Sequence, residues 1–269
     1  MKIRLAILLS IFSLPVVAGF NLTSVSNIST AGSNIALVLN HEAFVINPAF
    51  LHLSRFAVSN QQLDTTKLHT DKHSLSYIIF NGLGIGTFQK KNSEQDINVT
   101  LFGYGASINR NFSWGITYQT ISVQTSTALL NSWSSLFGVS YANFRDNFFI
   151  GVTLEHFLKE NNQALDQIIF PTIGIGLNLI PWEQVMWSHK LSYQRKHNEP
   201  IRYSTGISII ANENIIFNFG LHESAYSLGF DIPIQLQPQS YLGSGRFAIE
   251  IPYDTAQEII YSLSYTWGN

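Results

Sequence analysis

Side chains that could carry chemistry are sparse in this 269-residue chain. It has no cysteine, so disulfides and thiolate metal sites are excluded. The eight histidines show neither HExxH nor HxH spacing, and no GxSxG nucleophile motif occurs. A Ser–His pair on a membrane-facing wall is the alternative, with His156 or His189 as base, but no serine is marked as its nucleophile. The sequence therefore predicts a protein that is not an enzyme and that carries no metal or cofactor.

Seven polar residues remain that could line an interior, because they recur on the same face of their segments as small residues. One interpretation is that they pair with one another and hold that interior together. The other is that they form a polar pathway for a solute. We favour the pairing interpretation. The residues are Glu155, Lys190, Gln194, Arg202, Asp231, Arg246 and Glu250.

The composition indicates the class of protein to which these residues belong. Charged residues are only 12% of the chain, against about 25% in ordinary globular proteins, and aromatic residues are 13%. A formal net charge of −2 argues against nucleic acid as a partner. No segment after the N-terminal one approaches the roughly 18 apolar residues of a transmembrane helix. A membrane-spanning chain of this kind would have to be a closed β-barrel.

The hydrophobic pattern agrees with a barrel, because apolar and small polar residues alternate with a period of two. Counting such segments gives about 14, most of the length that a tilted strand needs to cross a bilayer. We predict an all-β, transmembrane antiparallel barrel over 50–269, as a single domain. The predicted strands are 50–61, 73–80, 82–91, 97–108, 112–125, 132–144, 147–159, 168–180, 185–197, 201–212, 214–222, 224–235, 244–254 and 258–268.

The two faces of these segments differ in kind. Ile173, Ile175 and Leu177 alternate with Gly174 and Gly176, for example. The apolar and aromatic face suits lipid, and the small, glycine-rich face suits a confined interior. A soluble β-sandwich or barrel is the alternative, but Lys and Glu would then crowd the polar face.

The N-terminus has the order of a signal peptide over 1–18. Lys2 and Arg4 precede a short apolar run, and Val16 and Ala18 are the small residues before a cleavage site. A buried N-terminal helix is the less favoured alternative. We therefore expect export, to the outer membrane of a Gram-negative bacterium.

Prolines mark the positions where strand pairing should be interrupted. Asn47-Pro48-Ala49 predicts a tight turn, because Pro48 lacks a backbone donor and Asn47 can bond its own backbone two residues on. The same missing donor makes Pro171, Pro233 and Pro252 candidate kinks in the wall.

The stretch "STAGSNIALVLNHEAFVINPAFLHL" resembles the N-terminal signature of the FadL superfamily of outer-membrane barrels, which includes long-chain fatty-acid transporters and PorV/PorQ-type secretion proteins. The matching steps are Ala31-Gly32, Ala36, Glu42-Ala43-Phe44 and Asn47-Pro48-Ala49. The resemblance implies a 14-stranded barrel whose segment 19–49 lies inside as a plug.

The same resemblance implies two possible functions. The first is uptake or passage of fatty acids or other hydrophobic molecules. The second is a non-transporting barrel that docks a secretion or surface protein, as in the PorV-type branch. With either function, membrane lipid is a partner of the protein. The chain differs from the long-chain fatty-acid transporters in having short loops. The loops of those transporters are long and form the ligand groove.

Overall fold

The computed structural model describes residues 30, 33, 35–36, 43–65, 72–91, 95–125, 129–159, 170–195, 201–212, 215–235, 242–254 and 259–268. Its described part contains a short helix α3 (Ala43–Ile46), a 3₁₀ helix η1 (Pro48–Leu53) and fourteen strands. The strands are β1 (Phe56–Thr65), β2 (Lys72–Phe80), β3 (Leu83–Lys91), β4 (Gln95–Ser107), β5 (Phe112–Thr125), β6 (Leu129–Asn143), β7 (Phe148–Lys159), β8 (Thr172–Trp182), β9 (Val185–Gln194), β10 (Arg202–Asn212), β11 (Ile215–His222), β12 (Ala225–Gln235), β13 (Leu242–Pro252) and β14 (Ile260–Gly268).

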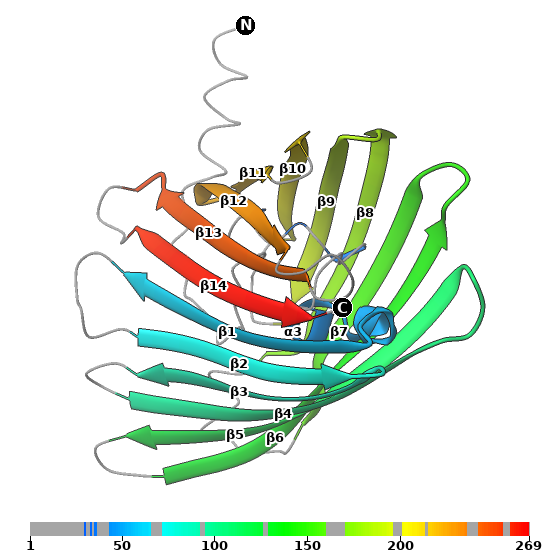
Figure 1. The fold of residues 1–269 in the computed structure, drawn as a ribbon. Helices are drawn as coiled ribbons and strands as arrows, with labels where there is room; N and C mark the ends of the chain where they lie inside the picture. The colour runs from blue at the N-terminus through cyan, green and yellow to red at the C-terminus, as the bar shows by residue number, and fades with distance from the viewer. Residues whose placement is uncertain are drawn as a thin grey trace, which may run out of the picture.

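The strands form one closed antiparallel barrel in which each strand pairs with its neighbours in sequence (Figure 1). Strand β1 closes the ring by pairing with β14, with Ala57 opposite Gly268 and Thr65 opposite Ile260. Closure leaves no unpaired strand edge, which is what allows a sheet to stand in lipid. The predicted fold, a transmembrane barrel of about fourteen strands, is confirmed.

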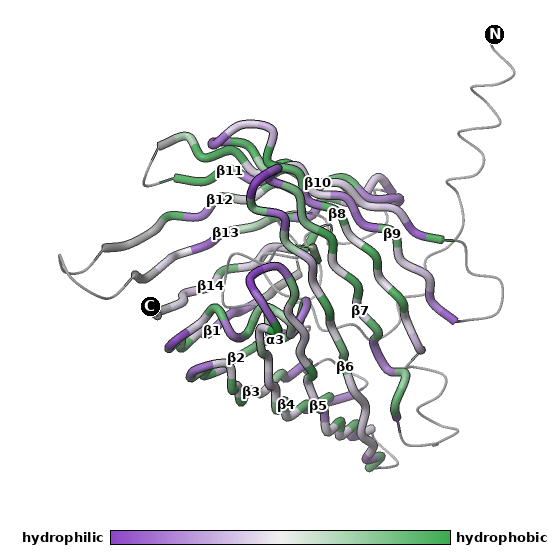
Figure 2. Tube along the Cα trace, turned by 90° about the vertical axis from the view of Figure 1, so that its right-hand side faces the viewer, coloured by the Kyte–Doolittle hydropathy of each residue, from purple (hydrophilic) through white to green (hydrophobic). Residues whose placement is uncertain are grey.

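Hydrophobic and hydrophilic positions follow one another along the strands (Figure 2), and burial follows the same alternation. The predicted faces are correct: Ile175 and Leu263 point outward with 51% and 63% of their surface exposed, whereas Asn178 and Ser262 are buried inside. Large apolar and aromatic side chains cover the outside of the barrel, as lipid contact requires.

The predicted strands after the first agree with the structure within a few residues. The hairpin between β2 and β3 turns on Asn81-Gly82, both with positive φ, which is the favoured two-residue turn chemistry. The first predicted strand, 50–61, was wrong at its start, because β1 begins only at Phe56. Residues Pro48–Leu53 instead form η1, capped by Asn47 with Pro48 at its first position, where a missing N–H costs nothing.

The N-terminal elements lie inside the barrel. All four residues of α3 are buried, and η1 packs against β4, β5 and β6. No helix among the described residues is long and apolar enough to cross a membrane. The predicted signal peptide, 1–18, lies outside the described residues, as does most of the predicted plug segment, 19–49.

Candidate functional site

A belt of glycines on the inner wall receives the N-terminal residues. At each of these glycines a Cβ atom would overlap or crowd a residue between Thr30 and Leu51. At Gly115, for example, it would come 2.8 Å from the backbone nitrogen of Ala49. The wall thus has glycine where the N-terminal chain approaches it most closely. The glycine belt consists of Gly84, Gly86, Gly103, Gly105, Gly115, Gly138, Gly151, Gly174, Gly176 and Gly206, from β3 to β10.

Asn47 is the main polar anchor of this segment. Its side-chain oxygen accepts a hydrogen bond from the backbone nitrogen of Ala49 at 3.1 Å, the bond to its own backbone that the sequence suggests. Its side-chain nitrogen donates to the carbonyl of Ile35 at 2.8 Å and to that of Val139 on β6 at 3.4 Å. The fully buried side chain of Asn47 therefore joins two parts of the N-terminal segment to the wall.

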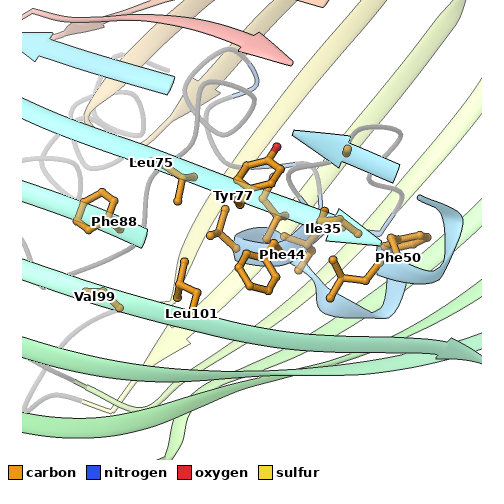
Figure 3. Packing of buried hydrophobic residues seen from close by; sticks show 14 of the residues in the cluster. Ile35, Phe44, Phe50, Leu75, Tyr77, Phe88, Val99 and Leu101 are labelled. Carbon is orange, nitrogen blue, oxygen red and sulfur yellow. The ribbon is translucent and has the colours of Figure 1, made fainter. Parts of the chain in front are cut away.

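Beside the glycine belt, the inner side of β2–β5 carries a group of apolar side chains. On β4, the inward positions run from Ile97, Val99 and Leu101 to Gly103 and Gly105. Figure 3 shows part of this surface, with Phe44 of α3 beside Tyr77, their ring centroids 6.2 Å apart. We call it the apolar inner wall: Leu75, Tyr77 and Ile79 on β2, Phe88 on β3, Ile97, Val99 and Leu101 on β4, and Ile121 and Val123 on β5.

The sequence analysis missed this wall, because it assigned small and polar residues to the whole interior. The sequence nevertheless contains a signal for this wall. Ile121 and Val123 have the same parity as Thr117 and Gln119, which the period of two places inside.

The seven predicted interior polar residues all lie on the inward face of their strands, between β7 and β13, alternating with outward ones. Arg246 contacts the carboxylate of Asp231 at 3.3 Å, directly across the β12–β13 pair. His222 lies 3.6 Å from Glu250. Lys190 interacts electrostatically with Glu155. Gln194 and Arg202 complete the set on β9 and β10. The interpretation that the seven residues pair with one another stays a prediction.

The pairing of β6 with β7 is interrupted. Leu136 pairs with Glu155, but the next recorded pair is Ser134 with Lys159, so three residues of β7 face one of β6. His156 within this bulge has φ of 58°, a left-handed conformation unusual for a residue in a strand. We call residues 156–158 the β6–β7 bulge.

The His156 side chain turns inward, where it is almost fully buried. Its Nδ1 lies 2.9 Å from the hydroxyl of Ser134, and its Nε2 lies 3.5 Å from Glu155. The Ser134 hydroxyl donates to Oε1 of Gln119 at 3.1 Å. Although serine, histidine and carboxylate meet in the order of a hydrolase triad, this serine is fully buried and its proton is directed to Gln119. The pair is therefore not on the lipid face, where the alternative in the sequence analysis needed it.

The three prolines proposed as wall kinks do not coincide with changes of register in the described strands. Pro233 pairs with Ser244 in an unshifted ladder, Pro252 ends β13, and Pro171 precedes β8. The register shifts lie between Ser134 and Leu136, between Leu179 and Trp182, and between Ile210 and Asn212. A kink at the prolines stays a prediction.

No protein-family model matches the sequence, and no curated protein matches it. Solved structures do match. The toluene transporter TodX of Pseudomonas putida superposes with a TM-score of 0.66 at 8% identity, over 94% of this chain and 98% of that one. The toluene transporter TbuX of Ralstonia pickettii gives 0.63 at 11%, over 93% and 98%. A FadL homologue of Pseudomonas aeruginosa gives 0.61 at 9%, over 93% and 100%.

At these identities the likeness shows the fold alone: this chain has the same kind of closed β-barrel as these transporters and the FadL homologue. The resemblance suggested by the N-terminal signature is thereby confirmed at the level of the fold. The comparisons give no support to the alternative of a docking barrel for a secretion or surface protein.

Proposed function

We propose that this barrel passes small hydrophobic molecules across the outer membrane of a Gram-negative bacterium. The observation that carries the proposal is the apolar inner wall. A channel for hydrophilic solutes gains nothing from nine apolar side chains on the inner face of β2–β5, whereas an apolar solute leaving water is stabilised by contact with them. The transporters that share the fold support the same class of solute.

In this proposal, segment 19–49 is a plug. The described part of it, including α3 and Asn47, lies against the glycine belt and is hydrogen bonded to the wall through Asn47, Thr117 and Ser140. A chain seated this closely leaves little free space, so passage requires the contacts around Phe44 to loosen.

The proposal also includes a lateral exit into the lipid. The β6–β7 bulge is its best-supported position, because three residues of β7 make no ladder pair there. Phe157 and Leu158 of the bulge are exposed on the lipid side, and Ser134 and Ser135 across from them are small. An apolar solute moving along the inner wall could leave between these strands with few backbone hydrogen bonds to break.

Uptake by intact cells tests this function. A strain lacking the gene should take up radiolabelled toluene or fatty acid more slowly than the same strain carrying it. Val99→Asp, which puts a charge on the apolar inner wall, should lower the uptake to near the level of the deletion strain. Ser192→Asp is the matched control, because it adds the same charge on the polar side, opposite Arg202. Equal uptake with and without the gene for both solutes would refute the proposal.

A further inference from the structure

Among the described residues, several polar atoms inside the barrel are buried without a hydrogen-bond partner, and one of them lies at the edge of the apolar inner wall. Within the described part of the chain, the side-chain nitrogen of Gln119 is buried and has no hydrogen-bond partner. Its side-chain oxygen accepts from Ser134, which is in turn in contact with His156. A buried amide that satisfies only its oxygen is uncommon, and such a group needs an explanation.

The setting of Gln119 is the boundary between the two kinds of interior surface. Its register partner on β4 is Leu101, and its register partner on β6 is Ser134. Along β5, the next inward residue is Ile121 of the apolar inner wall on one side. On the other side it is Thr117, whose hydroxyl donates to the carbonyl of Phe44 at 3.0 Å. A donor thus stands at the edge of an apolar surface, held in orientation by a serine.

Charges of both signs lie beyond the Ser134 and His156 contacts of this donor. The carboxylate of Glu155 lies 3.5 Å from Nε2 of His156, and Lys159 of β7 is the register partner of Ser134. With both signs of charge nearby, this buried uncharged donor favours an uncharged oxygen acceptor over a carboxylate.

We infer that Gln119 binds the oxygen of a solute that is otherwise apolar, so that the barrel selects uncharged oxygenated molecules, such as phenols and aromatic alcohols or ketones, over plain hydrocarbons. The inference rests on the proposed function and refines its substrate class. A plain hydrocarbon at this position leaves the amide nitrogen unsatisfied, and an oxygen acceptor satisfies it. Because Gln119 is fully buried, the solute reaches it only when the packing around Phe44 opens.

The test compares two solutes of the same shape, p-cresol and p-xylene, which differ by a hydroxyl in place of a methyl. Initial uptake rates into intact cells are measured with the deletion strain as background, and the p-cresol to p-xylene ratio is calculated for each variant. Gln119→Leu should lower this ratio about fivefold, the effect expected from one hydrogen bond. Ser134→Ala, which frees the amide to turn, should lower it less.

Gln124→Leu is the matched control, since it makes the same change on the outward face of the same strand and should leave the ratio as it is. Heat-modifiability on gels reports whether each barrel folds, and Gln119→Met replaces the leucine variant if that one fails. An unchanged ratio in the folded Gln119 variant overturns the inference while uptake above background keeps the proposed function. Background rates for both solutes in the parent overturn both.

Discussion

The inner sides of β2–β5 and of β7–β13 face the same lumen with opposite chemistry. The first is the apolar inner wall, packed against Phe44. The second holds seven charged or amide residues, with Arg246 and Asp231 in contact across the β12–β13 pair. Strand alternation fixes which residues point inward, but it leaves the chemistry of the inward face free to vary around the ring. One barrel therefore offers an apolar track and a polar, ion-paired support, separated by the Gln119–Ser134–His156 contacts.

The largest effect is expected when the same charge is placed on each of the two inner sides, β2–β5 and β7–β13. Leu101→Glu should lower the free energy of unfolding by about 3–5 kcal/mol, because the carboxylate is buried among apolar side chains without a partner. Ser192→Glu should cost less than about 1 kcal/mol, since its register partner is Arg202. Urea titration of the folded barrel in lipid vesicles measures both. Similar costs would show that the two halves are equally tolerant of charge.

The polar half is tested by removing one member of an ion pair. Arg246→Met should cost about 2–3 kcal/mol, because Asp231 is left without the cation that lies 3.3 Å away in the parent. The double variant Arg246→Met with Asp231→Asn should recover much of that loss. The same titration gives the coupling energy. Additive losses would mean that the pair does not support this side of the barrel.

The N-terminal segment lies between the two halves at Asn47. A change there should affect the segment more than the fold of the barrel. Asn47→Leu removes the bonds to Ala49, Ile35 and Val139 and leaves these buried groups unsatisfied, at a cost of roughly 1–3 kcal/mol. The barrel should still fold, but the segment should loosen and single-channel conductance in planar bilayers should rise. Conductance equal to the parent, also after deletion of 19–46, would show that the segment is not a plug.

Sequence periodicity was enough to predict the barrel, its number of strands and its two faces, because a period of two is a local property of each strand. It placed the start of β1 at Phe50 instead of Phe56, since the apolar run after Asn47-Pro48 fits η1 as well as a strand. The β6–β7 bulge was missed for a different reason. Its inward His156 depends on a left-handed backbone conformation that no local pattern marks.

The smallest effect is expected one residue after Asn47. Pro48→Ala should cost less than about 1 kcal/mol, because Pro48 donates no hydrogen bond and its main contribution is a φ angle suited to the first position of η1. Its contacts with Gly105 and Gly115 are made by the backbone carbonyl, which alanine keeps. The alanine barrel should remain heat-modifiable on gels and conduct like the parent in the assay used for Asn47→Leu. A conductance rise as large as that of Asn47→Leu would mean that the ring of Pro48, and not the Asn47 hydrogen bonds, holds the segment where the two halves meet.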